Sequence, residues 1–108
     1  MPKPSTLDVT VRVEPGSLGP DGKDHVEMYC KFAQKAFNKY EVKYANWSIV
    51  PRYDKKLPEM ELSLQDKKLT NSQSNKYLAL FDESLDELEE RVMNFISNLI
   101  DKFLGHKY

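Results

Sequence analysis

Apolar and polar residues alternate at two places in the chain, which is the pattern of a β-strand with one buried face. In residues 7–14, LDVTVRVE, leucine or valine occupies the first of every two positions, and residues 59–65, EMELSLQ, repeat the pattern with Met60, Leu62 and Leu64. Successive side chains of a strand point to opposite faces. Each stretch therefore predicts a strand whose apolar side faces a core and whose polar side faces solvent.

Two further stretches favour strands without a simple alternation. Residues 40–53, YEVKYANWSIVPRY, are rich in the aromatic and β-branched residues that strands prefer. Their apolar positions change sides between Tyr44 and Trp47, which predicts a β-bulge near Ala45 or Asn46. Residues 76–81, KYLALF, form a short apolar run after the polar stretch TNSQSN. We interpret this run as a central strand that follows a loop.

Residues 24–40 carry apolar side chains at helical spacing. Those that share one face of the predicted helix are Val26, Tyr29, Cys30, Ala33, Phe37 and Tyr40. Asp24 and Glu27 have the spacing of a capping box at its start. The stretch HVEMYCKF, residues 25–32, also alternates as a strand would. The alanine and glutamine that follow it, together with the cap, favour the helix.

The last segment, residues 84–105, has the signals of a helix at both of its ends. Ser84 and Glu87 form a second capping box, the first turns are acidic, and Gly105 is placed as a C-terminal cap. The acidic start and Lys102 near the end complement the helix dipole. An apolar stripe runs along the segment and widens toward its C-terminal end.

Together these elements predict an α+β domain with the order β-α-β-β-β-α. Strands with one polar face and helices with one apolar face pack as a two-layer sandwich, here a mostly antiparallel sheet with two helices on one face. A chain of 108 residues has the size of one domain. We therefore interpret residues 1–108 as a single α+β domain, in which residues 1–6 are a disordered or extended N-terminal tail.

Composition indicates the compartment and the distribution of charge. The single cysteine, Cys30, fits a reducing compartment, the first residues lack the apolar core of a signal peptide, and no long apolar run occurs. We expect a cytoplasmic protein with no membrane partner. The net charge of −1 is unevenly spread, because residues 31–81 hold ten basic and five acidic groups whereas both flanking blocks are acidic.

The residues that could carry catalysis or bind a metal do not form a recognised pattern. His25 and His106 have no partner at the spacing of metal ligands. Cys30 falls on the apolar face of the predicted helix, away from the electropositive, partly exposed surroundings that activate a thiol. Glu59 and Glu61 share the polar side of a strand and lack the neighbouring lysine of a metal-dependent nuclease. We predict no metal, no cofactor and no enzymatic activity.

The solvent side of the predicted helix is the first candidate for a binding surface. Lys31, Lys35 and Lys39 follow one another at a spacing of four, which places them on one stripe opposite the apolar face. Met28 falls in the same stripe and Phe32 lies at its border. Methionine and aromatic side chains beside lysines suit a partner protein. The alternative is that this stripe is an ordinary solvated helix face.

The apolar stripe of the last helix is the second candidate. Phe95, Leu99, Ile100 and Phe103 belong to its widest part, and one face of a small sheet need not cover all of them. A second copy of the chain could cover the remainder, which predicts a homodimer. The alternative is that these residues complete the core of the single chain.

The sequence as a whole favours a small non-enzymatic binding or adaptor protein that acts through protein–protein interaction. The alternative is a nucleic acid or ribosome binder that uses the basic central region, with base stacking on Tyr40, Tyr44, Trp47 or Tyr53. The order of elements is similar to that of ribosome hibernation factors, which bind structured RNA, although no signature residues are shared. Arginine, the usual reader of bases, occurs only three times.

Overall fold

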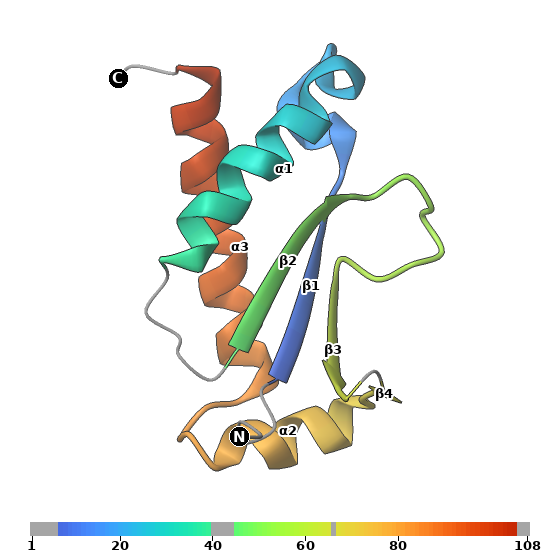
Figure 1. Ribbon diagram of the computed structural model, residues 1–108, viewed down its shortest axis with the longest axis vertical. Helices are drawn as coiled ribbons and strands as arrows, with labels where there is room; N and C mark the ends of the chain where they lie inside the picture. Colours follow the sequence, from blue (N-terminus) through green and yellow to red (C-terminus); the bar gives the residue numbers. More distant parts are fainter. Residues whose placement is uncertain (1–6, 40–44, 66, 106–108) are drawn as a thin grey trace.

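Four strands form one mixed sheet in the part of the chain that the structure, a computed structural model, describes, namely residues 7–39, 45–65 and 67–105 (Figure 1). The strands are β1 (Leu7–Val13), β2 (Ala45–Pro51), β3 (Met60–Leu64) and β4 (Lys67–Lys68). Their order is β2-β1-β3-β4; β1 is parallel to β2 and antiparallel to β3, and β4 is antiparallel to β3. The sheet is therefore mostly antiparallel, as predicted. The predicted tail at residues 1–6 lies outside the described residues.

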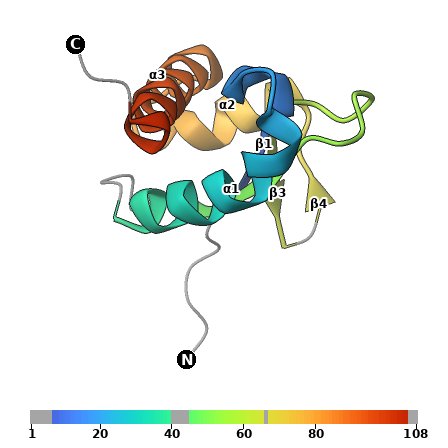
Figure 2. The ribbon, with the colours of Figure 1, turned by 90° about the horizontal axis from the view of Figure 1, so that it is seen from above.

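Three α-helices accompany the sheet in the described part of the chain. They are α1 (Gly22–Asn38), α2 (Asn71–Ala79) and α3 (Leu85–Leu104), and a short 3₁₀ helix, η1 (Pro15–Leu18), precedes α1. Helices α1 and α3 lie side by side, whereas α2 crosses the end of the sheet at which β1 begins (Figures 1 and 2). The predicted α+β class is confirmed, with one helix more than expected.

The alternation in β1 gives the sheet one buried face. The apolar residues of this strand, Leu7, Val9, Val11 and Val13, are all buried. The register places Val9 between Trp47 of β2 and Leu62 of β3, which are buried as well. Because paired residues of neighbouring strands point to the same face, one apolar surface extends across three strands. The predicted inner sides of these strands are therefore confirmed. The predicted bulge near Ala45 or Asn46 is wrong, because the register with β1 is continuous from Ala45 to Pro51.

Helix α1 contacts both the buried face of the sheet and α3. The ring of Phe37 lies 5.0 Å from that of Trp47 on β2, measured between centroids, and 4.8 Å from that of Phe95 on α3 in an edge-to-face arrangement. Leu88 and Val92 of α3 belong to the same hydrophobic core as these residues. Aromatic pairs at such distances add to the free energy gained by burial. Phe37 therefore joins three elements that are far apart in the sequence.

A buried hydrogen bond also ties α1 to α3. The hydroxyl of Tyr29 donates to the carbonyl oxygen of Ile96 at 3.0 Å. The ring of Tyr29 packs edge-to-face on Phe103, with centroids 5.4 Å apart. Burial raises the pKa of the Tyr29 hydroxyl well above its ordinary value, and the neighbouring Cys30 adds to the effect. The hydroxyl therefore stays protonated and able to donate.

The prediction of a loop followed by a central strand at 76–81 is wrong, because residues 71–79 form α2. The Thr70 hydroxyl accepts from the N–H of Gln73, and the Gln73 side chain accepts from the N–H of Thr70, which makes a capping box. Leu78 is buried, but Leu80 and Phe81 are exposed, as residues of a central strand would not be. The last strand is instead the two-residue β4, and α2 is an additional helix between it and α3.

Helix α1 begins two residues before the predicted start, and Asp24 does not cap it. Asp21 occupies the N-cap position without a side-chain hydrogen bond, and Asp24 lies in the first turn, where its charge complements the helix dipole. The start of the helix packs closely on η1. A Cβ atom on Gly22 would lie 1.7 Å from the carbonyl oxygen of Pro15, so only glycine fits there. The predicted helix is otherwise confirmed as far as Asn38, and Tyr40 lies outside the described residues.

Helix α3 has the ends that the sequence predicts. The Ser84 hydroxyl accepts from the N–H of Glu87, and Gly105 ends the helix in the left-handed conformation with φ of 70°. The Glu87 carboxylate accepts from the Ser84 hydroxyl. The predicted pair therefore forms the cap, but the carboxylate bonds the side chain of Ser84, whereas in a capping box it would bond the backbone N–H. Among the described helices, none has the length and apolar composition needed to cross a membrane.

Replacing Tyr29 with phenylalanine tests the bond between α1 and α3. Tyr29→Phe removes the hydroxyl and keeps the ring, so we expect the free energy of unfolding to fall by about 1 kcal/mol. Tyr53→Phe is the matched control, because the exposed Tyr53 hydroxyl bonds a surface carboxylate, that of Glu27, at 3.2 Å. Its effect should stay within about 0.5 kcal/mol. Urea unfolding measures the free energy of unfolding of both variants. Equal stability of Tyr29→Phe and the unmodified chain would show that the bond does not stabilise the fold.

Candidate interaction surface

The residues predicted to bind a partner lie together on the solvent face of α1. Met28 is 67% exposed and Phe32 is 38% exposed. Lys31, Lys35 and Lys39 are exposed on the same side, Lys39 at the C-cap position. This arrangement follows from the helical period, because the opposite side of α1, with Tyr29, Ala33 and Phe37, is buried. We call the five residues together the α1 face.

Phe32 connects the α1 face to the apolar stripe of α3. Its ring lies 5.7 Å from that of Phe103 and 6.4 Å from that of Tyr29, measured between centroids. The predicted partner surface and the predicted dimer stripe therefore adjoin at Phe32 and Phe103, which the sequence did not indicate.

The other residues of the α3 stripe have neighbours within the chain. Leu99 is buried, Phe95 packs edge-to-face on Phe37, and Ile100 and Phe103 are half-buried against the core. These contacts account for much of the apolar surface that we expected a second copy to cover. The homodimer through this stripe stays a prediction.

A groove lies beside the α1 face, between α1 and β2. Its volume is about 620 Å³. Buried side chains of Cys30 and Ile49 form the floor, and the exposed side chains of Lys31, Lys35 and Tyr53 stand around it. The remaining lining residues are Glu27, Gln34 and Pro51. Apolar floors with a few polar groups at the rim are typical of binding sites.

Inside this groove, the side chain of Gln34 hydrogen-bonds the outer edge of β2. Its amide nitrogen donates to the carbonyl oxygen of Trp47 at 2.7 Å, and its amide oxygen accepts from the N–H of Ile49 at 2.8 Å. A neighbouring strand would bond the same two groups. Pro51, at the end of β2, has no N–H to offer. The side chain of Gln34 thus takes the place of an additional strand and fixes α1 against β2.

The chemistry of Cys30 does not favour catalysis. The thiol is buried, and burial raises its pKa to about 11, with a smaller contribution from the nearby Glu27 carboxylate. A thiol with this pKa is almost entirely protonated near neutral pH and is a poor nucleophile. Among the described residues, no three histidine, cysteine or carboxylate side chains gather as metal ligands.

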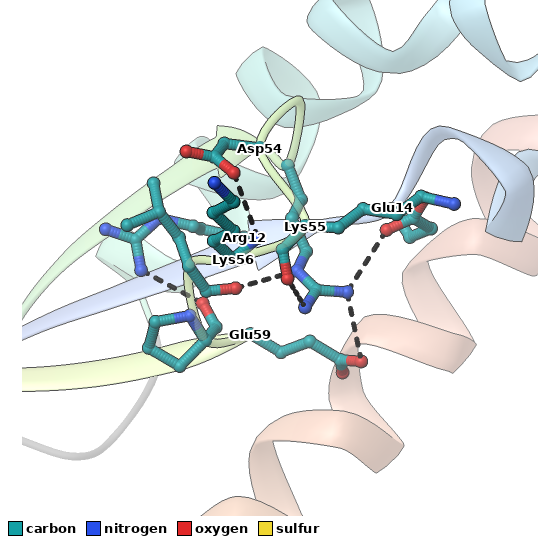
Figure 3. A network of polar contacts seen from close by, with 9 residues as sticks. Arg12, Glu14, Asp54, Lys55, Lys56 and Glu59 are labelled. Carbon is teal, nitrogen blue, oxygen red and sulfur yellow. Dashed lines mark hydrogen bonds and ion pairs between the residues drawn. The ribbon is translucent and has the colours of Figure 1, made fainter.

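Arg52 organises the loop between β2 and β3. Its guanidinium donates to the carbonyl oxygens of Leu57 and Lys55, both at 2.9 Å, and to the Glu14 carboxylate at 3.3 Å. Figure 3 shows the carboxylates of Glu14 and Glu59 on the same side of this network. The loop projects away from α1 and α3 (Figures 1 and 2). No local pattern in the sequence indicated the role of Arg52.

All three arginines are engaged by glutamates. The pairs are Arg12 with Glu61, Arg52 with Glu14, and Arg91 with Glu83. The cations left for a partner are mainly lysines, and those among the described residues do not all lie at one place. Lys67 and Lys68 lie on β4, at the opposite edge of the sheet from β2 and the neighbouring α1. Tyr40 and Tyr44, predicted for base stacking, lie outside the described residues, and Trp47 is buried.

No model of a protein family, no curated protein and no solved structure matches the chain. The function must therefore be inferred from the chemistry of the described surface.

The double hydrogen bond of Gln34 predicts a measurable contribution to stability. In Gln34→Ala, the bonds to the Trp47 carbonyl and the Ile49 N–H are lost at a partly buried edge, so the free energy of unfolding should fall by about 1 to 2 kcal/mol. Asn38→Ala is the control, because the bond that Asn38 accepts from Gln34 is exposed and its loss should cost no more than about 0.5 kcal/mol. Thermal and urea unfolding of both variants give the comparison. A Gln34→Ala chain as stable as the control would contradict this role.

Proposed function

We propose that the chain is a small non-enzymatic binding or adaptor protein that acts through protein–protein interaction, using the α1 face and the adjoining groove. The observation that carries this proposal is the exposure of Met28, which is 67% accessible on a helix whose opposite side is fully buried. A large apolar side chain in this position is dehydrated only when a partner covers it.

The composition of the α1 face supports a protein partner. Met28 and Phe32 supply apolar contact area, and the flexible thioether of methionine adapts to different partner shapes. Lys31 and Lys35 beside them favour a partner that carries carboxylates. Exposed apolar groups bordered by charged ones are a common composition of protein interaction sites.

Binding is better supported than catalysis. The Cys30 thiol is buried, with its pKa raised to about 11, and the carboxylates Glu14 and Glu61 are engaged by arginines. A nucleophile, its base and a third orienting group would have to converge for catalysis. At the groove, the Glu27 carboxylate accepts from the Tyr53 hydroxyl and the Gln34 amide bonds the edge of β2.

Binding of nucleic acid through the basic central region receives less support. The arginines that would read bases or grip phosphates are held by glutamates. The lysines of α1 and of β4 belong to different edges of the sheet. A phosphate backbone is bound most tightly by several cations on one continuous surface.

Reversing one charge on the α1 face tests the proposal. Lys35→Glu should reduce the recovery of specific partners in a quantitative pull-down from lysate, because an acidic partner would meet a like charge. The matched control is Lys76→Glu on the exposed surface of α2. Both exposed substitutions should change stability by no more than about 0.5 kcal/mol, so unfolding cannot explain a difference.

Three results would contradict the proposal. Equal recovery of the same partners by Lys35→Glu and the unmodified chain would rule out the α1 face. Recovery of nucleic acid that is lost after nuclease treatment would favour the alternative. Recovery of only a second copy of the chain would indicate the predicted homodimer.

A further inference from the structure

We propose that the groove between α1 and β2 binds an acidic amphipathic helix of a partner protein, whose apolar side chains enter the groove while its carboxylates pair with Lys31 and Lys35. This inference rests on the proposed function and goes further, because it specifies the chemistry and the conformation of the partner segment.

The apolar part of the partner is indicated by the floor of the groove. Cys30 and Ile49 are buried at its base, Pro51 is half-buried, and the ring of Tyr53 stands 65% exposed at its side. The space of about 620 Å³ is open to solvent, so side chains of a partner can reach the apolar floor from outside. Apolar side chains that project from a partner are the groups that gain most from entering such a space.

The charge of the partner is indicated by the lysines of the groove. Lys31 and Lys35 make no ion pair with any described residue, and both are exposed. Glu27 is the carboxylate among the described residues that line the groove, and it already accepts from the Tyr53 hydroxyl at 3.2 Å. Two lysines one helical turn apart match two carboxylates one turn apart on a partner helix.

The conformation of the partner is indicated by the edge of β2. A peptide that bound as an extra strand would need the Trp47 carbonyl and the Ile49 N–H, and Gln34 already bonds both. Further along the edge, Pro51 cannot donate. A partner therefore gains its contacts through side chains, as a helix laid in a groove does.

Three synthetic peptides of identical length separate these features. The first is an amphipathic helix with leucines at positions i, i+3, i+4 and i+7 and with glutamates flanking them at a spacing of four. The second replaces each glutamate with lysine. The third keeps the composition of the first but alternates leucine and glutamate, so that it favours a strand. Each is titrated into the ¹⁵N-labelled full chain and followed by NMR.

The variants locate the binding site. Lys31→Glu combined with Lys35→Glu should weaken binding of the acidic helix at least about tenfold, because like charges then face each other. The control combines Lys67→Glu with Lys76→Glu, two exposed lysines on β4 and α2. It makes the same change in net charge and should leave the affinity unchanged. Tyr53→Ala should also weaken binding, through the loss of apolar contact at the groove.

The proposal predicts that only the acidic helix binds and that it shifts the amide signals of Lys31, Lys35 and Ile49. Stronger binding of the basic helix or of the alternating peptide would overturn it, as would shifts confined to another surface. The absence of any shift at about 1 mM acidic peptide would overturn it too, because a specific complex binds more tightly than a dissociation constant of about 1 mM. If partner recovery still depended on Lys35 in that case, the proposed function would stand and this inference alone would fall.

Discussion

The position of α1 depends on the side-chain amide of Gln34, which bonds the edge of β2 at the Trp47 carbonyl and the Ile49 N–H. This contact joins a helix to a strand edge that would otherwise present unpaired backbone groups. The Tyr29 hydroxyl makes a second attachment, to the Ile96 carbonyl of α3. Held on two sides, α1 cannot rotate about its axis without breaking both. Its buried and exposed positions are therefore set by polar contacts as well as by apolar packing.

The orientation of α1 determines which of its side chains face solvent. It turns Met28 and Lys35 toward solvent and leaves a groove beside β2 whose floor is Cys30 and Ile49. The same Gln34 contact that positions the helix also occupies the strand edge. In our proposal, one side chain therefore contributes both to the stability of the fold and to the mode of binding. Apart from Tyr53 at the side of the groove, the loop held by Arg52 projects on another side (Figures 1 and 2).

The sequence predicted those elements whose hydrophobic period is clear. The period of two in β1 and β3, the period of 3.6 in α1 and the caps of α3 all led to correct elements. The period also placed the residues of the α1 face toward solvent. It failed for α2, because a six-residue apolar run fits a strand or a helix equally well. The capping box of Thr70 and Gln73 was the signal that could have decided it. The groove and the contact of Phe32 with Phe103 depend on tertiary packing, and no local pattern encodes them.

The most direct test of this account is the hydrogen exchange rate of the Ile49 amide in the native chain. If Gln34 holds the edge of β2, this outward-facing amide should exchange as slowly as the amides of the central strand β1, because its hydrogen bond must open first. Exchange as fast as in the exposed loop between β2 and β3 would show that the edge is open and that α1 is not fixed by Gln34.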